Sequence, residues 1–95
     1  MQTTINRIDK STLRNMPFKT REILVDKDDI QRRLDDLNRA MLLGNLFKET
    51  VRLQFQNSRS EPMETEATVW SVTEKNVILK GGLTIPIHSI SKVRL

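Results

Sequence analysis

The hydrophobic residues of this chain change their spacing near residue 49, from a helical repeat to strict alternation. Upstream of that point, spacings of four, three and four separate the apolar residues Ile30, Leu34, Leu37 and Met41. Such spacing draws one apolar stripe along an α-helix. Downstream, Val51, Leu53 and Phe55 alternate with polar residues, which is typical of a strand with one buried face. The sequence therefore predicts one amphipathic helix followed by β structure.

Residues with special backbone preferences predict where the helix begins and ends. Asp28 or Asp29 is expected to be its N-cap, since a short carboxylate side chain accepts hydrogen bonds from the first free backbone N–H groups. Gly44 is expected to end it as a left-handed C-cap. The helix would then have about four turns. Because a helix of this length is marginal alone in water, its stripe should cover an open end of the β structure or a second copy.

The segment before the helix has no regular period, and Pro17 prevents a helix from running through Met16. We expect residues 1–27 to form a partly irregular N-terminal arm. Residues 28–95 are expected to form a single helix-plus-barrel domain, because 95 residues suffice for one hydrophobic core.

Turn residues divide the C-terminal half into five short strands. Gly81 and Gly82 tolerate the positive φ of a tight turn, and Pro86, which lacks an amide donor, indicates an edge strand or an interrupted ladder. We expect antiparallel pairing, with a partly open barrel as the result. The predicted core comprises Val51, Leu53, Phe55, Val69, Ile78, Leu79, Ile85, Ile90 and Val93.

The composition argues against several chemistries. The chain has no cysteine, which excludes disulfides, thiolate zinc sites and thiol nucleophiles. His88 is the only histidine and no carboxylate lies near it in sequence, so we expect no metal, no cofactor and no enzymatic activity. No run approaches the roughly 20 apolar residues of a membrane helix, and the start lacks the features of a signal peptide. The expected location is the cytoplasm.

The order of one helix and five short strands resembles that of Sm-like proteins, a branch of the SH3-like barrels. The segment Pro86 to Val93 is similar to the end of bacterial Hfq at four positions, His88, Ile90, Ser91 and Val93. Asn76 falls where many Sm proteins place a base-contacting asparagine. The same apolar spacing also resembles the end of YolD-like bacterial proteins. The resemblance covers residues 30–95 and implies a five-stranded antiparallel Sm-like barrel, with RNA binding as one function.

Two function classes follow, and neither is enzymatic. The first is a protein-interaction or scaffolding domain, for which the expected partner is another protein or a second copy in a dimer or small oligomer. Its candidate contacts are Leu34, Met41 and Trp70, although Trp70 is expected first of all to pack beneath a neighbouring helix.

The alternative is an Sm-like protein that binds single-stranded RNA, compatible with the net charge of +4. Its candidate residues are Lys75, Asn76, His88 and Lys92. For His88, the simplest interpretation is a turn histidine with one hydrogen-bonded ring nitrogen. The first class is preferred, because Ala67 stands where the Sm pattern has glycine and Ile87 where Hfq has lysine.

Overall fold

One long helix and two β-sheets make up the protein in the computed structural model, which describes residues 5–95. The first four residues of the predicted arm lie outside the described residues. In chain order the elements are β1 (Asn6–Arg7), the 3-10 helix η1 (Lys10–Asn15), α1 (Lys27–Phe47), β2 (Val51–Gln56), β3 (Pro62–Ala67), β4 (Val69–Val72), β5 (Asn76–Leu79), β6 (Thr84–Pro86), the 3-10 helix η2 (Ile87–Ser89) and β7 (Ile90–Arg94). No helix in this part of the chain is both long and apolar enough to cross a membrane.

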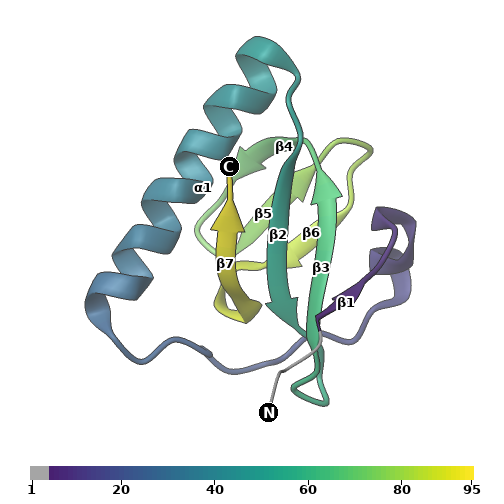
Figure 1. Cartoon of the computed structure of the whole chain (residues 1–95), viewed down its shortest axis with the longest axis vertical. Coiled ribbons are helices and arrows are strands. Elements are labelled where there is room, and N and C mark those ends of the chain that lie inside the picture. Colours follow the sequence, from purple (N-terminus) through teal and green to yellow (C-terminus); the bar gives the residue numbers. More distant parts are fainter. Residues whose placement is uncertain (1–4) are drawn as a thin grey trace.

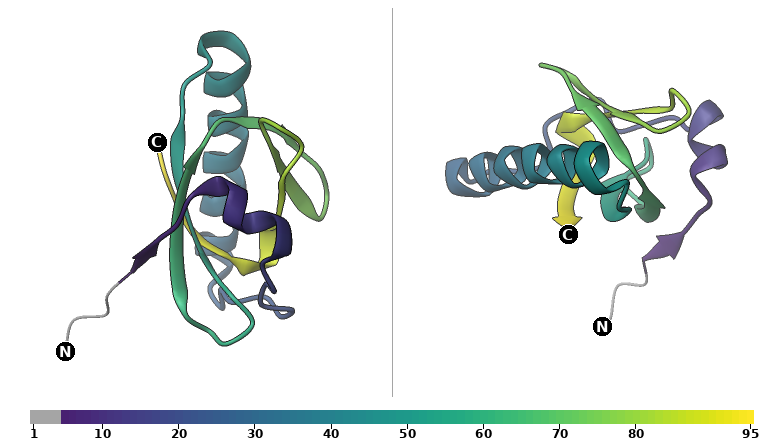
Figure 2. Two further views of the ribbon diagram at one scale, coloured as in Figure 1. Left: turned by 90° about the vertical axis from the view of Figure 1, so that its right-hand side faces the viewer. Right: turned by 90° about the horizontal axis from the view of Figure 1, so that it is seen from above.

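The two sheets follow one another along the chain. The first has the strand order β1-β3-β2-β7 and the second the order β4-β5-β6. Only Thr68 separates β3 from β4, so the chain passes directly from one sheet to the other, and β7 returns to pair antiparallel with β2. Figures 1 and 2 show α1 on one side of the sheets and η1 on the opposite side. The mainly β prediction is confirmed.

The predicted arrangement needs one correction. The helix is not N-terminal, because β1 and η1 precede it in the chain. The strands of residues 5–95 form two hydrogen-bonded sheets, of four and three strands, and no closed barrel. Pro86 lies in β6, which is an edge strand of the three-stranded sheet, as its missing amide donor predicts.

The core lies between the sheets and α1, and it contains eight of the nine predicted residues. The exception is Ile78, which is half-buried, while its neighbour Val77 is completely buried. Successive side chains of a strand point to opposite faces, so Val77 and Leu79 share the core face and Ile78 cannot. Further buried apolar residues are Leu13, Leu37, Ala40 and Ala67.

The helix is longer than predicted at both ends. Its N-cap is Asp26, whose Oδ1 accepts a hydrogen bond from the backbone N–H of Asp28 at 2.8 Å. At the other end Lys48, with φ of 56°, is the left-handed C-cap. Asp28 and Asp29 lie in the first turn, where carboxylates interact favourably with the helix dipole. The predicted caps were therefore wrong, and α1 has 21 residues.

Gly44 is buried inside α1 because the helix comes close to β4 at this residue. A Cβ atom on Gly44 would lie 2.3 Å from the backbone oxygen of Val69 and 3.0 Å from Cγ2 of Thr68. Real Cβ atoms essentially never lie closer than 3.0 Å to such an atom, so the distance to the oxygen of Val69 rules out a Cβ here. Gly44 is therefore required by the distance between helix and strand, and not by a left-handed conformation.

The buried face of α1 is rotated from the predicted stripe. It consists of Arg33, Leu37, Ala40 and Gly44. Of the predicted stripe only Leu37 is fully buried, whereas Leu34 is 39% exposed. The small residues Ala40 and Gly44 allow the helix to approach the sheet. A prediction of the buried face from large apolar side chains alone does not include them.

The N-terminal arm packs against the side of the sheets opposite α1. β1 pairs with β3 in parallel, and Leu13 of η1 is buried in the core. Farther along, the ring of Phe18 lies 5.5 Å from that of Phe55. The arm then crosses to the start of α1, along the lower edge of Figure 1.

Candidate functional site

Three of the four predicted nucleic-acid-binding residues line one shallow depression. Lys75 comes from the turn between β4 and β5, Asn76 is the first residue of β5, and His88 comes from η2. The strand pairing of Asn76 with Pro86 brings the turn and η2 together, and the N–H of Ile87 donates to the oxygen of Lys75 at 2.9 Å. The other lining residues are Glu22, Arg33, Glu74, Pro86 and Ile87. We call this the turn depression.

Hydrogen bonds from Thr73 hold the turn that carries Lys75 and Asn76. The hydroxyl oxygen of Thr73 accepts from the backbone N–H of Asn76 at 3.0 Å, and the backbone N–H of Thr73 donates to the oxygen of Asn76 at 2.8 Å. The half-buried side-chain amide of Asn76 makes no hydrogen bond with residues 5–95. Within the described chain this amide is free to bond a ligand.

His88 is engaged with the N-terminal arm through both its ring and its backbone. The Nε2 atom lies 2.7 Å from the backbone oxygen of Lys19, and because a carbonyl oxygen only accepts, Nε2 carries the proton and donates. The N–H of Ile23 donates to the oxygen of His88 at 3.1 Å. This geometry agrees with a turn histidine that has one hydrogen-bonded ring nitrogen.

A charged pair beside the turn depression was not predicted from the sequence. The guanidinium of Arg33 on α1 is buried, at 5% exposure, and both terminal nitrogens donate to the Glu22 carboxylate, one of them at 2.7 Å. Nη1 of Arg33 also donates to the oxygen of Ile90 at 3.0 Å. Arg33 lies outside the apolar stripe that the sequence predicted as the buried face of the helix. No local signal links a helical arginine to a glutamate 11 residues away in an irregular segment.

The hydrogen bond from Arg33 holds the pKa of the Glu22 carboxyl below its usual range, although partial burial opposes the effect. Because this pKa is lower in the folded chain than in the unfolded one, the stabilisation is fully present above the unfolded value of 4.5. It is lost as pH falls through the folded value.

We therefore expect Glu22→Gln to be less stable than the parent chain at about pH 6, by about 1–2 kcal/mol, since the carboxylate is partly exposed to screening solvent. Urea unfolding at about pH 6 and about pH 2 measures this difference, which should shrink in acid. Glu74→Gln, an exposed carboxylate of the same depression, is the matched control. A difference between Glu22→Gln and the parent that does not depend on pH would contradict the assignment.

Lys92 does not join the other three predicted residues. It lies exposed on β7, opposite Gln54 of β2, and lines a separate depression between β7 and α1. The reason is that β7 leads away from η2, so a residue only four positions beyond His88 lies at a different surface. The structure thus brings together Lys75, Asn76 and His88 only.

The three predicted partner-binding residues lie on α1 and on β4, which pack against each other. Trp70 is 47% exposed, so the expectation that it packs beneath a helix was wrong. Leu34 is exposed to a similar degree and Met41 is half-buried. Three further exposed apolar residues were missed because they lie off the predicted stripe, namely Leu42, Leu46 and Phe47.

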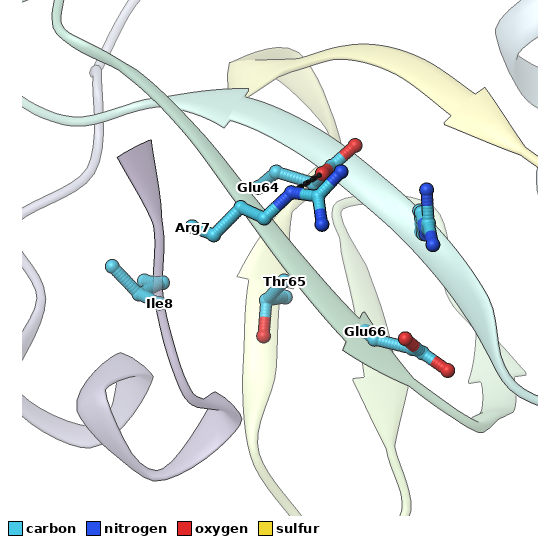
Figure 3. A pocket seen from close by; sticks show the side chains of 6 residues that line it. Arg7, Ile8, Glu64, Thr65 and Glu66 are labelled. Atoms are coloured by element: carbon cyan, nitrogen blue, oxygen red, sulfur yellow. Dashed lines mark ion pairs between the residues drawn. The ribbon is translucent and has the colours of Figure 1, made fainter. Parts of the chain in front are cut away.

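A third depression lies where β1 leaves β3, and its carboxylates serve the fold (Figure 3). Nε of Arg7 lies 3.1 Å from Oε2 of Glu64, and Nε2 of Gln54 donates to Oε1 of Glu64 at 3.1 Å. Both oxygens of this buried carboxylate are thus occupied in joining β1, β3 and β2. Across residues 5–95 no group of three or more histidine and acidic side chains is placed to hold a metal ion.

Two surfaces thus hold most of the candidate residues, the turn depression and the exposed apolar side chains of α1 and β4, while Lys92 lies on neither. Comparisons of the chain with protein-family models, curated proteins and solved structures give no match.

Proposed function

We propose that this chain is a small non-enzymatic protein-interaction domain. The observation that carries the proposal is the set of large exposed apolar side chains on α1 and β4, two elements that pack against each other. We call this set the apolar surface; it consists of Leu34, Leu42, Leu46, Phe47 and Trp70. Contiguous exposed apolar side chains on a soluble fold are typical of docking sites, and a half-exposed tryptophan is a frequent energetic centre of such sites.

Most of these residues lie near the C-terminal end of α1. Leu42 and Leu46 are four residues apart and lie on neighbouring turns of one exposed helix face. Gly44 lies on the opposite, buried face, where the helix approaches Val69, the neighbour of Trp70 on β4. The tryptophan and the last turns of α1 thus belong to the same part of the molecule.

We infer further that the two sheets are halves of a partly open barrel of the Sm-like, SH3-like type. Three features support this inference. The chain crosses between sheets at Thr68, β7 pairs with β2, and α1 packs on β4 and β7 at the gap between the sheets. This arrangement fits the helix and five strands that the resemblance to Sm-like proteins implies, with the predicted second strand divided into β3 and β4.

Self-association is the first test of the apolar surface, and we expect a dimer or small oligomer. Light scattering after size exclusion should show a mass above that of one chain, and Leu46→Lys with Trp70→Ala should reduce it to the monomer mass. Val25→Ala is the matched control, because Val25 is 96% exposed but lies alone on the arm. A parent chain that stays monomeric at high concentration, or a double variant that associates like the parent, would contradict self-association through this surface.

A second candidate function, binding of single-stranded RNA, is favoured by the convergence of Lys75, Asn76 and His88. In this alternative the free amide of Asn76 bonds a base edge while Lys75 contacts phosphate. Binding of an oligoribonucleotide should weaken steeply with salt and fall markedly in Asn76→Ala. Lys92→Ala is the control, since Lys92 lies outside the turn depression. Absence of binding at low salt would eliminate this candidate.

A further inference from the structure

The last part of the N-terminal arm, residues 19–26, forms a strap that is held mainly by polar contacts. It begins after the bridge between Phe18 and Asn57 and ends at Asp26, the N-cap of α1. Of its apolar side chains, Ile23 and Leu24 are only half-buried and Val25 is exposed. A segment with so little buried apolar area belongs to the less stable parts of a fold.

The contacts of the strap are those of an extended peptide in a binding groove. Its backbone is hydrogen-bonded through Lys19 and Ile23 to the ring and the backbone oxygen of His88. The strap carboxylate of Glu22 is clamped by two nitrogens of Arg33, a geometry that fixes both the position and the direction of a carboxylate. The apolar residues Ile23 and Leu24 follow directly. We call the site formed by Arg33, His88 and the oxygen of Ile90 the strap groove.

Arg33 favours an anionic occupant of this groove. Its guanidinium is buried between two depressions, one on the side of His88 and one on the side of Lys92. The terminal nitrogens of Arg33 donate to Glu22 and to the oxygen of Ile90. The third guanidinium nitrogen, Nε, has no hydrogen-bond partner among residues 5–95. A buried cation without a counter-ion is strongly unfavourable. A segment that covers Arg33 in place of the strap is therefore favoured if it supplies a carboxylate at the same place.

We propose that the strap groove is a second binding site, for an extended segment of a partner protein in which a carboxylate precedes aliphatic residues, and that the strap occupies it as an internal ligand. This site is separate from Trp70 and from Leu42, Leu46 and Phe47, the part of the apolar surface at the C-terminal end of α1. The strap competes at an effective concentration in the millimolar range, because it is tethered to the groove. The closed chain therefore binds such a segment weakly, and loosening of the strap opens the site.

A fluorescent synthetic peptide with the sequence of residues 17–26 is the probe, and its binding to full-length variants is measured by anisotropy. Glu22→Gln should bind it at least about tenfold more tightly than the parent chain, because the weakened strap competes less. Glu74→Gln removes a charge from the same depression without touching the strap, and should bind like the parent. A peptide with glutamine in place of its glutamate should bind Glu22→Gln at least about tenfold more weakly than the original peptide, since it offers Arg33 no counter-ion.

Equal binding to Glu22→Gln and Glu74→Gln, or equal binding of the two peptides, would overturn the proposal. If Glu22→Gln does not fold, Ile23→Ala loosens the strap without removing the counter-ion of Arg33, with Val25→Ala as its control.

Concentration-dependent dimers of Glu22→Gln that the peptide dissociates would show exchange of straps between copies, and would overturn the choice of a partner protein as occupant. Trp70→Ala should leave peptide binding unchanged, so failure of the apolar surface and failure of the groove are distinguishable.

Discussion

Gly44→Ala should lower the free energy of unfolding by about 1–3 kcal/mol, although alanine is the better helix former by about 1 kcal/mol. The added Cβ would lie 2.3 Å from the backbone oxygen of Val69. A backbone atom of a paired strand cannot yield as the end of a flexible side chain does. The helix must therefore move away from β4, and it then loses contacts along its buried face.

Urea unfolding followed by circular dichroism measures this effect. Asn45→Ala is the matched control, because the neighbouring residue is exposed in the same helix and should gain slightly from alanine. If Gly44→Ala were as stable as Asn45→Ala, the close approach of α1 to β4 would be refuted. Because the apolar surface spans this contact, Gly44→Ala should also weaken self-association.

Hydrophobic periodicity predicted the strands well wherever one face is buried and the other solvated. The alternation of Val51, Leu53 and Phe55 identified β2 and its inward side chains, and Pro86 identified an edge strand. Periodicity failed in β5, where Val77, Ile78 and Leu79 are all apolar, because such a run contains no information on which face is buried. It could not reveal the pairing of β1 with β3 either, since that contact joins residues more than 50 positions apart.

The candidate surfaces were predictable only in part, and for a physical reason. The turn before Asn76 and the kink at His88 are local features of the sequence, whereas their convergence depends on the pairing of β5 with β6, which no spacing in the sequence specifies. The pair of Arg33 and Glu22 depends on how the irregular arm crosses the start of β7, which no local pattern specifies. Of the apolar surface, only Leu34 and Trp70 were predicted. Leu42 and Leu46 were missed because they lie off the stripe through Leu37, and the orientation of α1 depends on small residues that carry little hydrophobic signal.

The orientation of α1 gives the second large effect, a contrast between two leucines that the sequence pattern treats alike. Leu37→Ala should lower the free energy of unfolding by about 2–5 kcal/mol, since it removes a fully buried side chain and leaves a cavity beneath the helix. Leu34→Ala should cost less than about 1 kcal/mol, because much of that side chain already contacts water.

Substitution by aspartate makes the contrast larger and separates stability from binding. Leu37→Asp buries a carboxylate. The only cation on the same buried helix face is Arg33, which is already engaged by Glu22. We therefore expect circular dichroism to show a largely unfolded chain. Leu34→Asp should stay folded and lose part of its self-association, because Leu34 belongs to the apolar surface. Similar losses of stability for the two aspartates would mean that α1 packs through the stripe of Ile30, Leu34, Leu37 and Met41. In that case Leu34 would belong to the core and could not contribute to docking.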